Sequence, residues 1–383
     1  MKIAYISSIA YADLDLSLVK HLLQYADVTY FMLVGPNRKS TAIDLSKTCL
    51  NEGLTNARLL PELSCFSSFI ELDKTFVVYS SSKRGLSWAT LKKDHSLYCF
   101  LKEKHFDIVH LTTAPSYTMW ELLQFRKKTV LTVHDPIPHS SSKNRMTELW
   151  RIIAFKTIKN IILLNQSQKA EFVNRYRLKE SKKNIFVSRL GVYSYLQLFD
   201  DGKNRTIGDY ILFFGNILSY KGLDYLFPAM AELHKLLPKV KLIVAGQGKY
   251  YFDITPYKKM SCFDIRNQFI SDLELASLIH YSKFVVAPYV DATQSGVVMS
   301  AFAFNKPCVV TNVGGLPEMV VNGRHGIVIP PKDSVSLYQA MASLLTDEKR
   351  LRFYEKNIAE DYSNGLKSWN AITEELYSFY KTI

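Results

Sequence analysis

Two segments in the second half of the chain place polar groups where an apolar run gives way to a helical pattern. In the first, apolar residues 210–214 lead into the turn 215–222 (Gly-Asn-Ile-Leu-Ser-Tyr-Lys-Gly), and helical spacing follows from Leu223. A strand, a turn with glycine, a lysine and a helix start favour phosphate binding, because free backbone N–H groups and the positive end of the helix dipole meet there. The turn is no Walker sequence, so a merely solvated Lys221 is the alternative interpretation.

The second segment, residues 284–318, has the order strand, polar loop, helix and strand. The apolar run 284–287 is followed by a polar loop, then by a helix predicted from Gly296 to Phe304 and by a second apolar run, 308–310. Crossovers between parallel strands have this order. Ser295 or Thr293 can cap the helix, and Gly296 lets a ligand approach the backbone. The pattern predicts an anion site at the carboxyl edge of a parallel sheet. An ordinary capped helix is the alternative.

A histidine–aspartate pair in the first half follows a predicted strand directly. His134-Asp135 comes after the apolar run 129–133 and before two prolines that stiffen the loop. Such pairs form orienting hydrogen bonds, and His134 is a candidate contact for a sugar or a phosphate. A loop histidine with a local partner is the alternative.

Apolar runs that alternate with helical patterns predict two doubly wound parallel sheets. The best candidate linker is the polar stretch 200–207. We therefore expect an N-terminal domain at 1–200, a C-terminal domain at 201–360 and a final helical segment at 361–383. The predicted strands are 2–7, 28–34, 107–111, 129–133, 161–164 and 185–187 in the first domain, and 210–214, 241–245, 266–270, 284–287 and 308–310 in the second.

Composition bounds the class of protein. The chain has 383 residues, of which 48% are hydrophobic, enough for two buried cores. Five widely spaced cysteines without metal-ligand spacing are typical of a reduced, cytoplasmic protein. No apolar run approaches the roughly 20 residues of a membrane span. We interpret residues 1–12 as a first strand rather than a signal peptide, because serines interrupt the apolar stretch.

The net charge of +13 is unevenly distributed. Residues 1–200 hold 28 lysines and arginines against 17 aspartates and glutamates, whereas the rest of the chain is almost neutral. A basic domain suits an anionic membrane face, an acidic substrate or a nucleic acid. The stretch 143–159 is basic and amphipathic and contains Trp150, so it suits either a membrane surface or packing on the sheet. No nucleic-acid-binding module appears, so we expect no nucleic acid partner.

Two motifs resemble the family 4 retaining glycosyltransferases of the kind that assembles bacterial polysaccharides. Residues 301–307 (Ala-Phe-Ala-Phe-Asn-Lys-Pro) resemble the family pattern Ala-Met-Ala-x-Gly-x-Pro, and residues 313–318 (Val-Gly-Gly-Leu-Pro-Glu) match the turn that follows. The resemblance implies a GT-B fold, with two Rossmann-like domains, a cleft between them and a last helix that crosses back to the first domain. Family members also often carry a His-Asp at the place of His134-Asp135. The resemblance further implies that Asp13 and Asp15 lie in the loop that faces the acceptor in the family.

The resemblance also implies roles for particular residues. The family has a Gly-Arg turn followed by Lys-Gly at the donor diphosphate, and this chain keeps the lysine but has Asn216 in place of the arginine. The family's paired glutamates correspond to Ala292 and Ser300, and loop 293–297 resembles a subset with Thr-Gln-Ser-Gly-Val. The expected catalytic residues are Lys221, His134 and Asp135. The expected donor-binding residues are Gly215, Asn216, Gly222, Gly246, Gln247, Gln294, Ser295, Gly296, Val297 and Ser300.

The function that the resemblance implies is transfer of a sugar from a nucleotide-diphosphate sugar, of UDP or GDP type, to a glycan or lipid-linked acceptor with retention. The sequence shows no metal-ligand cluster, so we expect no metal and no cofactor. The basic first domain predicts peripheral contact with the cytoplasmic face of an anionic membrane. The alternatives are a GT-B nucleotide-sugar epimerase and a non-catalytic nucleotide- or glycan-binding protein, the latter because of Ala292, Ser300 and Asn216.

Overall fold

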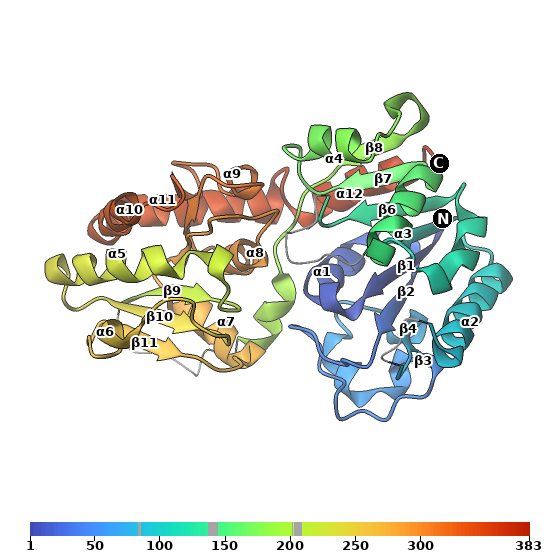
Figure 1. Cartoon of the computed structure of the whole chain (residues 1–383), viewed down its shortest axis with the longest axis horizontal. Coiled ribbons are helices and arrows are strands. Elements are labelled where there is room, and N and C mark those ends of the chain that lie inside the picture. The colour runs from blue at the N-terminus through green and yellow to red at the C-terminus, as the bar shows by residue number, and fades with distance from the viewer. Residues whose placement is uncertain (83–85, 137–144, 201, 203–208) are drawn as a thin grey trace. The chain divides into compact units, whose positions relative to one another are not determined.

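The computed structural model describes residues 1–82, 86–136, 145–200, 202 and 209–383. The chain forms two compact units, residues 1–191 with 369–383, and residues 192–368 (Figure 1). The sequence-based ranges divide instead at 200/201 and 360/361. The candidate linker 200–207 lies outside the described residues apart from Asp200 and Gly202.

The first unit is built on an eight-stranded sheet of order β3-β4-β2-β1-β5-β6-β7-β8. All neighbours are parallel except β3, which is antiparallel to β4. Strands β5 and β6 are buried at every residue, as expected of strands covered on both faces. The strands are β1 (Lys2–Ser8), β2 (Asp27–Val34), β3 (Gly53–Asn56), β4 (Thr75–Tyr79), β5 (Ile108–Leu111), β6 (Thr129–Val133), β7 (Asn160–Leu163) and β8 (Asn184–Val187).

The helices of the first unit include the last one of the chain. Helix α12 packs on α1, where the rings of His21 and Trp369 lie 6.2 Å apart, and Glu375 pairs with Arg189 at 2.5 Å. Residues 117–125 form a run of 3-10 turns, η5 (Tyr117–Phe125), with a kink at Met119. The α-helices are α1 (Ala12–Leu22), α2 (Trp88–Lys104), α3 (Arg145–Thr157), α4 (Lys169–Arg175) and α12 (Trp369–Tyr380).

Helix α3 lies in the predicted basic amphipathic stretch 143–159, whose residues 143 and 144 fall outside the described part. Ala154 and Phe155 are buried in the core of the first unit, so the packing interpretation holds for the C-terminal half of the helix. Met146 and Leu149 in the N-terminal half are 53% and 50% exposed. That half therefore presents apolar side chains to solvent.

The second unit is built on a six-stranded, all-parallel sheet of order β11-β10-β9-β12-β13-β14. The predicted strand 266–270 is wrong, because β11 ends at Arg266 and pairs with β10 from Phe263 onward. Beyond it, the Asn267 side chain bonds the backbone of Gly248 and Phe269 is 48% exposed. The strands are β9 (Tyr210–Phe214), β10 (Lys241–Ala245), β11 (Phe263–Arg266), β12 (Val285–Ala287), β13 (Cys308–Thr311) and β14 (Gly326–Ile329).

Side-chain caps begin several helices of the second unit. Ser271, Asp333 and Asp347 accept hydrogen bonds from backbone N–H groups in the first turns of α7, α10 and α11. Helices α5 and α10 pack together beside the sheet (Figure 1). The helices are α5 (Leu223–Leu236), α6 (Thr255–Lys258), α7 (Asp272–Tyr281), α8 (Gly296–Ala303), α9 (Leu316–Met319), α10 (Ser334–Thr346) and α11 (Glu348–Ala359). Within the described ranges, no helix in either unit has the length and apolar character needed to cross a bilayer.

The strand orders confirm two doubly wound parallel sheets. In each sheet the chain builds outward on one side of the first strand and then returns to its other side, so β1 lies between β2 and β5, and β9 lies between β10 and β12. Ligands of open α/β sheets bind outside the carboxyl ends of the strands at such a reversal of strand order. A ligand of each unit is therefore expected beside the residues that follow β9 and β12, or β1 and β5.

Candidate functional site

The turn after β9 and the loop after β12 meet at the carboxyl edge of the second unit's sheet. Strand β9 leads into the 3-10 turn η8 (Ser219–Lys221), and β12 leads into the loop that begins at Pro288. The backbone N–H of Val290 donates to the carbonyl of Tyr220 at 2.8 Å. The two predicted segments are thus brought together by the adjacency of β9 and β12.

Lys221 projects onto aromatic rings at this junction. Its Nζ lies 3.8 Å from the ring centroid of Tyr289 and 5.1 Å from that of Tyr220. Burial lowers the pKa of the Lys221 amine to about 8, against an opposing effect of Tyr220. The group therefore carries most of its charge at neutral pH in a partly desolvated place, where an anion is attracted more strongly than in water.

Gly222 allows the turn that carries Lys221 to pack closely against the loop after β12. It adopts a left-handed conformation with φ of 70°, and a Cβ placed there would collide with the carbonyl oxygen of Pro288. Only glycine satisfies both conditions. The Lys-Gly pair that the sequence singled out is thus a cation followed by the residue that allows its turn to pack on the β12 loop.

A second close backbone contact joins the turns after β9 and β10. A Cβ on Gly246, whose φ is 151°, would collide with the carbonyl oxygen of Gly215, and the N–H of Ile217 donates to the carbonyl of Gln247 at 2.9 Å. The side chains of Asn216 and Gln247 are exposed beside this contact. The structure therefore brings these four predicted donor residues, Gly215, Asn216, Gly246 and Gln247, together at one edge.

Helix α8 begins at the end of the β12 loop, as predicted. Ser295 is 2% exposed and caps the helix by accepting from the N–H of Val298 at 3.3 Å. Gly296 is needed because a Cβ there would lie 2.9 Å from the ring of Tyr193. N–H groups of the first turn have no acceptor within a helix, so this end of α8 suits a negative charge.

Three further predicted residues lie in or beside α8. Gln294 precedes the cap, and its Nε2 is buried without a hydrogen-bond partner among the residues that the structure describes. Ser300 is 5% exposed within the helix, and Val297 in the first turn is half-buried. The position of the family's other glutamate, Ala292, is 5% exposed. An unsatisfied buried amide carries a free-energy cost that a ligand hydroxyl can relieve.

His134 and Asp135 lie in the first unit, directly after β6. The His134 ring stacks on Tyr11 with centroids 3.9 Å apart and an interplanar angle of 7°. Burial lowers the pKa of His134 to about 4, so the ring is neutral at neutral pH. Its Nε2 is buried and has no partner among the described residues. The backbone carbonyl of Asp135 accepts from Arg151 at 2.6 Å.

Sequence reasoning missed the residues that surround this pair. A cavity of about 190 Å³ lies between His134, Asp135 and neighbours on other elements. Thr112 and Thr113 directly follow β5, and the sequence signal that could have found them is the same end-of-strand position that singled out His134. The remaining lining residues are Tyr11, Ala114, Thr132, Val133, Arg151 and Phe155.

Asp13 and Asp15 are not loop residues. Both lie in the first turn of α1, and Asp15 is fully buried. Its carboxyl group accepts from the hydroxyl of Tyr5 at 2.7 Å and from that of Tyr30 at 3.4 Å. The expectation that these aspartates lie in a loop is therefore wrong, because α1 already begins at Ala12.

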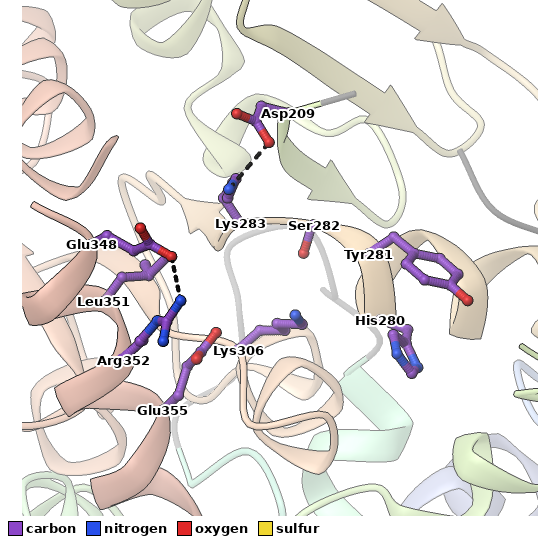
Figure 2. Close-up of a pocket in the computed structure, with 10 residues that line it drawn as sticks. All are labelled: Asp209, His280, Tyr281, Ser282, Lys283, Lys306, Glu348, Leu351, Arg352 and Glu355. Carbon is purple, nitrogen blue, oxygen red and sulfur yellow. Dashed lines mark hydrogen bonds and ion pairs between the residues drawn. The ribbon is translucent and has the colours of Figure 1, made fainter. Parts of the chain in front are cut away.

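A larger cavity of about 460 Å³ lies at the opposite edge of the second unit's sheet (Figure 2). Three of its lining residues are Asp209, which directly precedes β9, and Lys283 and Lys306, which lie two residues before β12 and β13. The cavity therefore opens at the amino ends of the strands. Lys283 pairs with Asp209 at 3.1 Å, and Arg352 pairs with Glu348 at 2.7 Å. These charges are balanced locally, which distinguishes this cavity from the edge that carries Lys221. Among the described residues, no cluster of three or more His, Cys, Asp or Glu side chains could hold a metal ion.

Comparison with known proteins relates this site to a family. Residues 208–347 match the sequence profile described as glycosyl transferases group 1. The matched residues lie within the second unit and make up less than half of the chain. The matched segment includes the Lys221 turn, the turn at Gly246 and the whole of α8.

Relatives and solved structures extend the likeness. An uncharacterized glycosyltransferase of Methanocaldococcus jannaschii is 28% identical over 241 residues, which are 58% of this chain and 59% of that relative. The match thus spans less than two thirds of the relative's length. Sucrose-phosphate synthase from Thermosynechococcus elongatus has a TM-score of 0.70 at 16% identity over 100% of this chain and 98% of that chain. HepE from Anabaena, in complex with UDP, has a TM-score of 0.68 at 15% identity over 100% of both chains. The chain has the GT-B fold of these proteins.

Proposed function

We propose that this protein is a glycosyltransferase that moves a sugar from a nucleotide-diphosphate sugar to a glycan or lipid-linked acceptor, with retention and without a metal. The observation that carries the proposal is Lys221, held on Tyr289 beside the capped start of α8, within the segment that matches the group 1 profile. The structurally similar HepE has been solved with UDP and with UDP-glucose, which supports a UDP-type donor.

The proposed reaction breaks the bond between the anomeric carbon and the diphosphate, and both bonding electrons stay on the diphosphate. The Lys221 ammonium and the N–H groups of Gly296 and Val297 stabilise that growing negative charge, and fixed donors do so without reorganisation. The acceptor hydroxyl forms the new C–O bond on the same face of the sugar. Its proton passes to an oxygen of the departing diphosphate.

The other predicted residues have binding roles in this proposal. Gln294, whose Nε2 is buried and unsatisfied, holds a sugar hydroxyl, and Ser300 bonds the ribose. The turns at Gly215–Asn216 and Gly246–Gln247 lie along the nucleotide. In the first unit, the neutral ring of His134, with Asp135 beside it, contacts the transferred sugar or the acceptor through hydrogen bonds rather than charge.

The basic charge of residues 1–200 supports an acceptor at an anionic membrane surface and a peripheral cytoplasmic location. The exposed Met146 and Leu149 on α3 add apolar contact. The full chain should sediment with vesicles of anionic lipid at low salt and be released at high salt, because surface charge is screened. A Leu149→Asp variant should bind less. Equal recovery with neutral vesicles would remove the membrane from the proposal.

The decisive experiment is a thermal-shift titration with UDP, GDP, ADP and their sugar conjugates. One nucleotide class should raise the Tm of the wild type, because a ligand that binds only the folded state stabilises it. Lys221→Ala should abolish the rise. The matched control Lys283→Ala, a cation at the opposite edge of the same sheet, should keep it. An unchanged rise in Lys221→Ala, or no rise with any nucleotide, contradicts the proposal.

The second candidate is a nucleotide- or glycan-binding protein without turnover. Ala292 and Ser300, both buried, supply no carboxylate at the positions of the family's glutamates. Binding of a nucleotide sugar without release of free nucleotide, over a panel of acceptors, would favour this candidate. Release of free monosaccharide in the absence of any acceptor would instead favour an epimerase.

A further inference from the structure

We propose that Tyr289 is a positioning residue for the donor site, whose ring holds the Lys221 ammonium group without neutralising it. The charge of Lys221 then remains available for an anionic group of the ligand. The identity of that ligand, a nucleoside diphosphate, rests on the proposed function. The contact between Lys221 and the Tyr289 ring is observed independently of that function.

The contact geometry is that of a cation–π pair. The Nζ of Lys221 lies 3.8 Å from the ring centroid of Tyr289, within the range where the negative face of an aromatic ring attracts a cation. The ring of Tyr220 stands nearly perpendicular to that of Tyr289, at 83° with centroids 6.2 Å apart. The two rings restrict the amine from two sides.

A ring holds a lysine differently from a carboxylate. Lys283 and Lys235 of the same unit pair with Asp209 at 3.1 Å and with Glu232 at 2.7 Å, which neutralises them. Within the described part of the chain, no carboxylate forms an ion pair with Lys221. A tyrosine ring carries no net charge, so the lysine keeps its attraction for an incoming anion. A bound diphosphate would supply the negative charge that pairs with Lys221.

Tyr289 is itself rigidly placed, which a positioning role requires. It is 1% exposed, its hydroxyl accepts from Ser295 at 3.3 Å, and its carbonyl accepts from Thr311 at 2.5 Å. Ser295 also caps α8. Through one side chain, the position of Lys221 is therefore tied to the start of α8.

A double-mutant cycle on the full chain tests the coupling. UDP dissociation constants are measured for Tyr289→Leu, Tyr289→Phe, Lys221→Gln and the doubles. Tyr289→Leu should weaken UDP binding about tenfold, since it removes the ring, and Tyr289→Phe should stay within about threefold because it keeps the ring. In the Lys221→Gln background, Tyr289→Leu should have almost no further effect. Equal weakening by Tyr289→Leu in both backgrounds would overturn the proposal.

A buried tyrosine in the same sheet provides the structural control. Tyr210 is 2% exposed in β9, and its hydroxyl donates to the carbonyl of Leu278 at 2.8 Å. Tyr210→Leu should lower the Tm and leave UDP affinity unchanged. A loss of UDP affinity in Tyr210→Leu as large as that in Tyr289→Leu would show that general destabilisation, not ring position, is being measured, and would also overturn the proposal.

A measurement without ligand separates this inference from the proposed function. In protein with labelled lysine, the methylene signal next to the Lys221 amine should be displaced by the ring current of Tyr289. The displacement should persist in Tyr289→Phe. An undisplaced signal in the wild type overturns the inference, even if Tyr289→Leu does not fold. If the signal is displaced but no nucleotide binds, the proposed function fails and the positioning role stands.

Discussion

The two sheets reverse their strand order in the same way, but in the part of the chain that the structure describes only the second unit places an available charge at the reversal. In the second unit, the reversal between β9 and β12 carries Lys221, an amine with no ion-pair partner within the described residues, surrounded by glycine turns. In the first unit, polar side chains within the strands that flank the corresponding reversal, Tyr5, Tyr30 and His110, are buried and form hydrogen bonds inside the unit. The comparison teaches that strand order provides a place for a ligand, whereas side chains decide whether charge is available there.

The network of the first unit is buried and nearly neutral. Burial raises the pKa of Asp15 to about 7, while Tyr5 and Tyr30 donate to its carboxyl group. His110 bonds Tyr380 through Nδ1 at 2.5 Å and Thr132 through Nε2 at 2.7 Å, and burial lowers the pKa of His110 to about 3. Such a network stabilises the unit by satisfying its own members.

The largest expected effect tests the close backbone contact in the second unit. Gly222→Ala should lower the free energy of unfolding by about 3 kcal/mol, because a Cβ meets the carbonyl of Pro288 in addition to the strain of a positive φ. Gly323→Ala is the matched control, since Gly323 has a similar φ of 76° and open space around it. Gly323→Ala should lower the free energy of unfolding by only about 1 kcal/mol. Urea unfolding measures both, and equal losses would contradict the contact.

The next prediction concerns the available charge of Lys221. Its pKa is lowered to about 8 by burial, so the amine is charged below that pH and neutral above it. UDP affinity should therefore fall about tenfold per pH unit above 8, as one proton becomes linked to binding. Tyr289, whose pKa burial raises, stays neutral over this range.

Lys221→Arg should bind UDP with little pH dependence between pH 8 and 9.5, because arginine keeps its charge. Calorimetric titration at several pH values measures both proteins. A wild-type affinity that is flat across this range would show that Lys221 does not contact the ligand.

The first unit should show its own pH dependence, in stability rather than in binding. The folded pKa of Asp15, about 7, lies above the ordinary 3.8, so the folded state binds more protons than the unfolded state between about pH 4 and 7. Stability should fall as pH rises through that window, by up to about 1.4 kcal/mol per pH unit.

Asp15→Asn should remove most of the dependence of the unfolding free energy on pH between pH 6 and 7. Burial raises the pKa of the neighbouring Asp13 to about 6, so Asp13 contributes to this dependence below pH 6. Urea unfolding at pH 5, 6 and 7 measures the slopes. Identical slopes in wild type and variant would mean that Asp15 is charged in the folded state.

His134→Ala tests whether the two units contribute to different steps, catalysis in the first unit and UDP binding in the second. It should lower the rate of sugar transfer about tenfold, because a positioned neutral hydrogen-bonding group is lost, and leave UDP affinity within about twofold of wild type. Steady-state kinetics with the donor class found by thermal shift, together with UDP titration, separates the two effects. A comparable loss of UDP affinity would place His134 in nucleotide binding instead.

The smallest effects are expected at the start of α8. Gln294→Ala and Ser300→Ala should each weaken binding of the nucleotide sugar about fivefold, the value of roughly one hydrogen bond of about 1 kcal/mol. For Gln294 the effect should be larger with the sugar conjugate than with UDP alone, since its proposed partner is a sugar hydroxyl. Unchanged affinity for both ligands would remove these residues from the site.

The sequence by itself determined the local structure around the site. Apolar runs located β6 and β9 to the residue, and the polar loop followed by glycine located the start of α8. Strands β3, β4 and β14 were missed, and β11 was displaced. Mixed composition explains β3 (Gly-Leu-Thr-Asn) and β11 (Phe-Asp-Ile-Arg), whereas β4 and β14 carry short apolar runs like those of the predicted strands. Lys221 and Gly222 were found because a lysine and a glycine at a strand–helix turn are informative without any partner.

Only the tertiary structure decided which residues meet Lys221. Nothing in the sequence states that β12 pairs with β9, yet that pairing brings Tyr289 to the lysine and Pro288 to Gly222. Likewise, Asp15 and His110 belong to a buried network, although Asp15 was expected in a loop and His110 only in a strand. The physical reason is that caps and turns depend on neighbours along the chain. Strand order instead depends on hydrogen bonding and burial summed over a whole sheet, which no local pattern encodes.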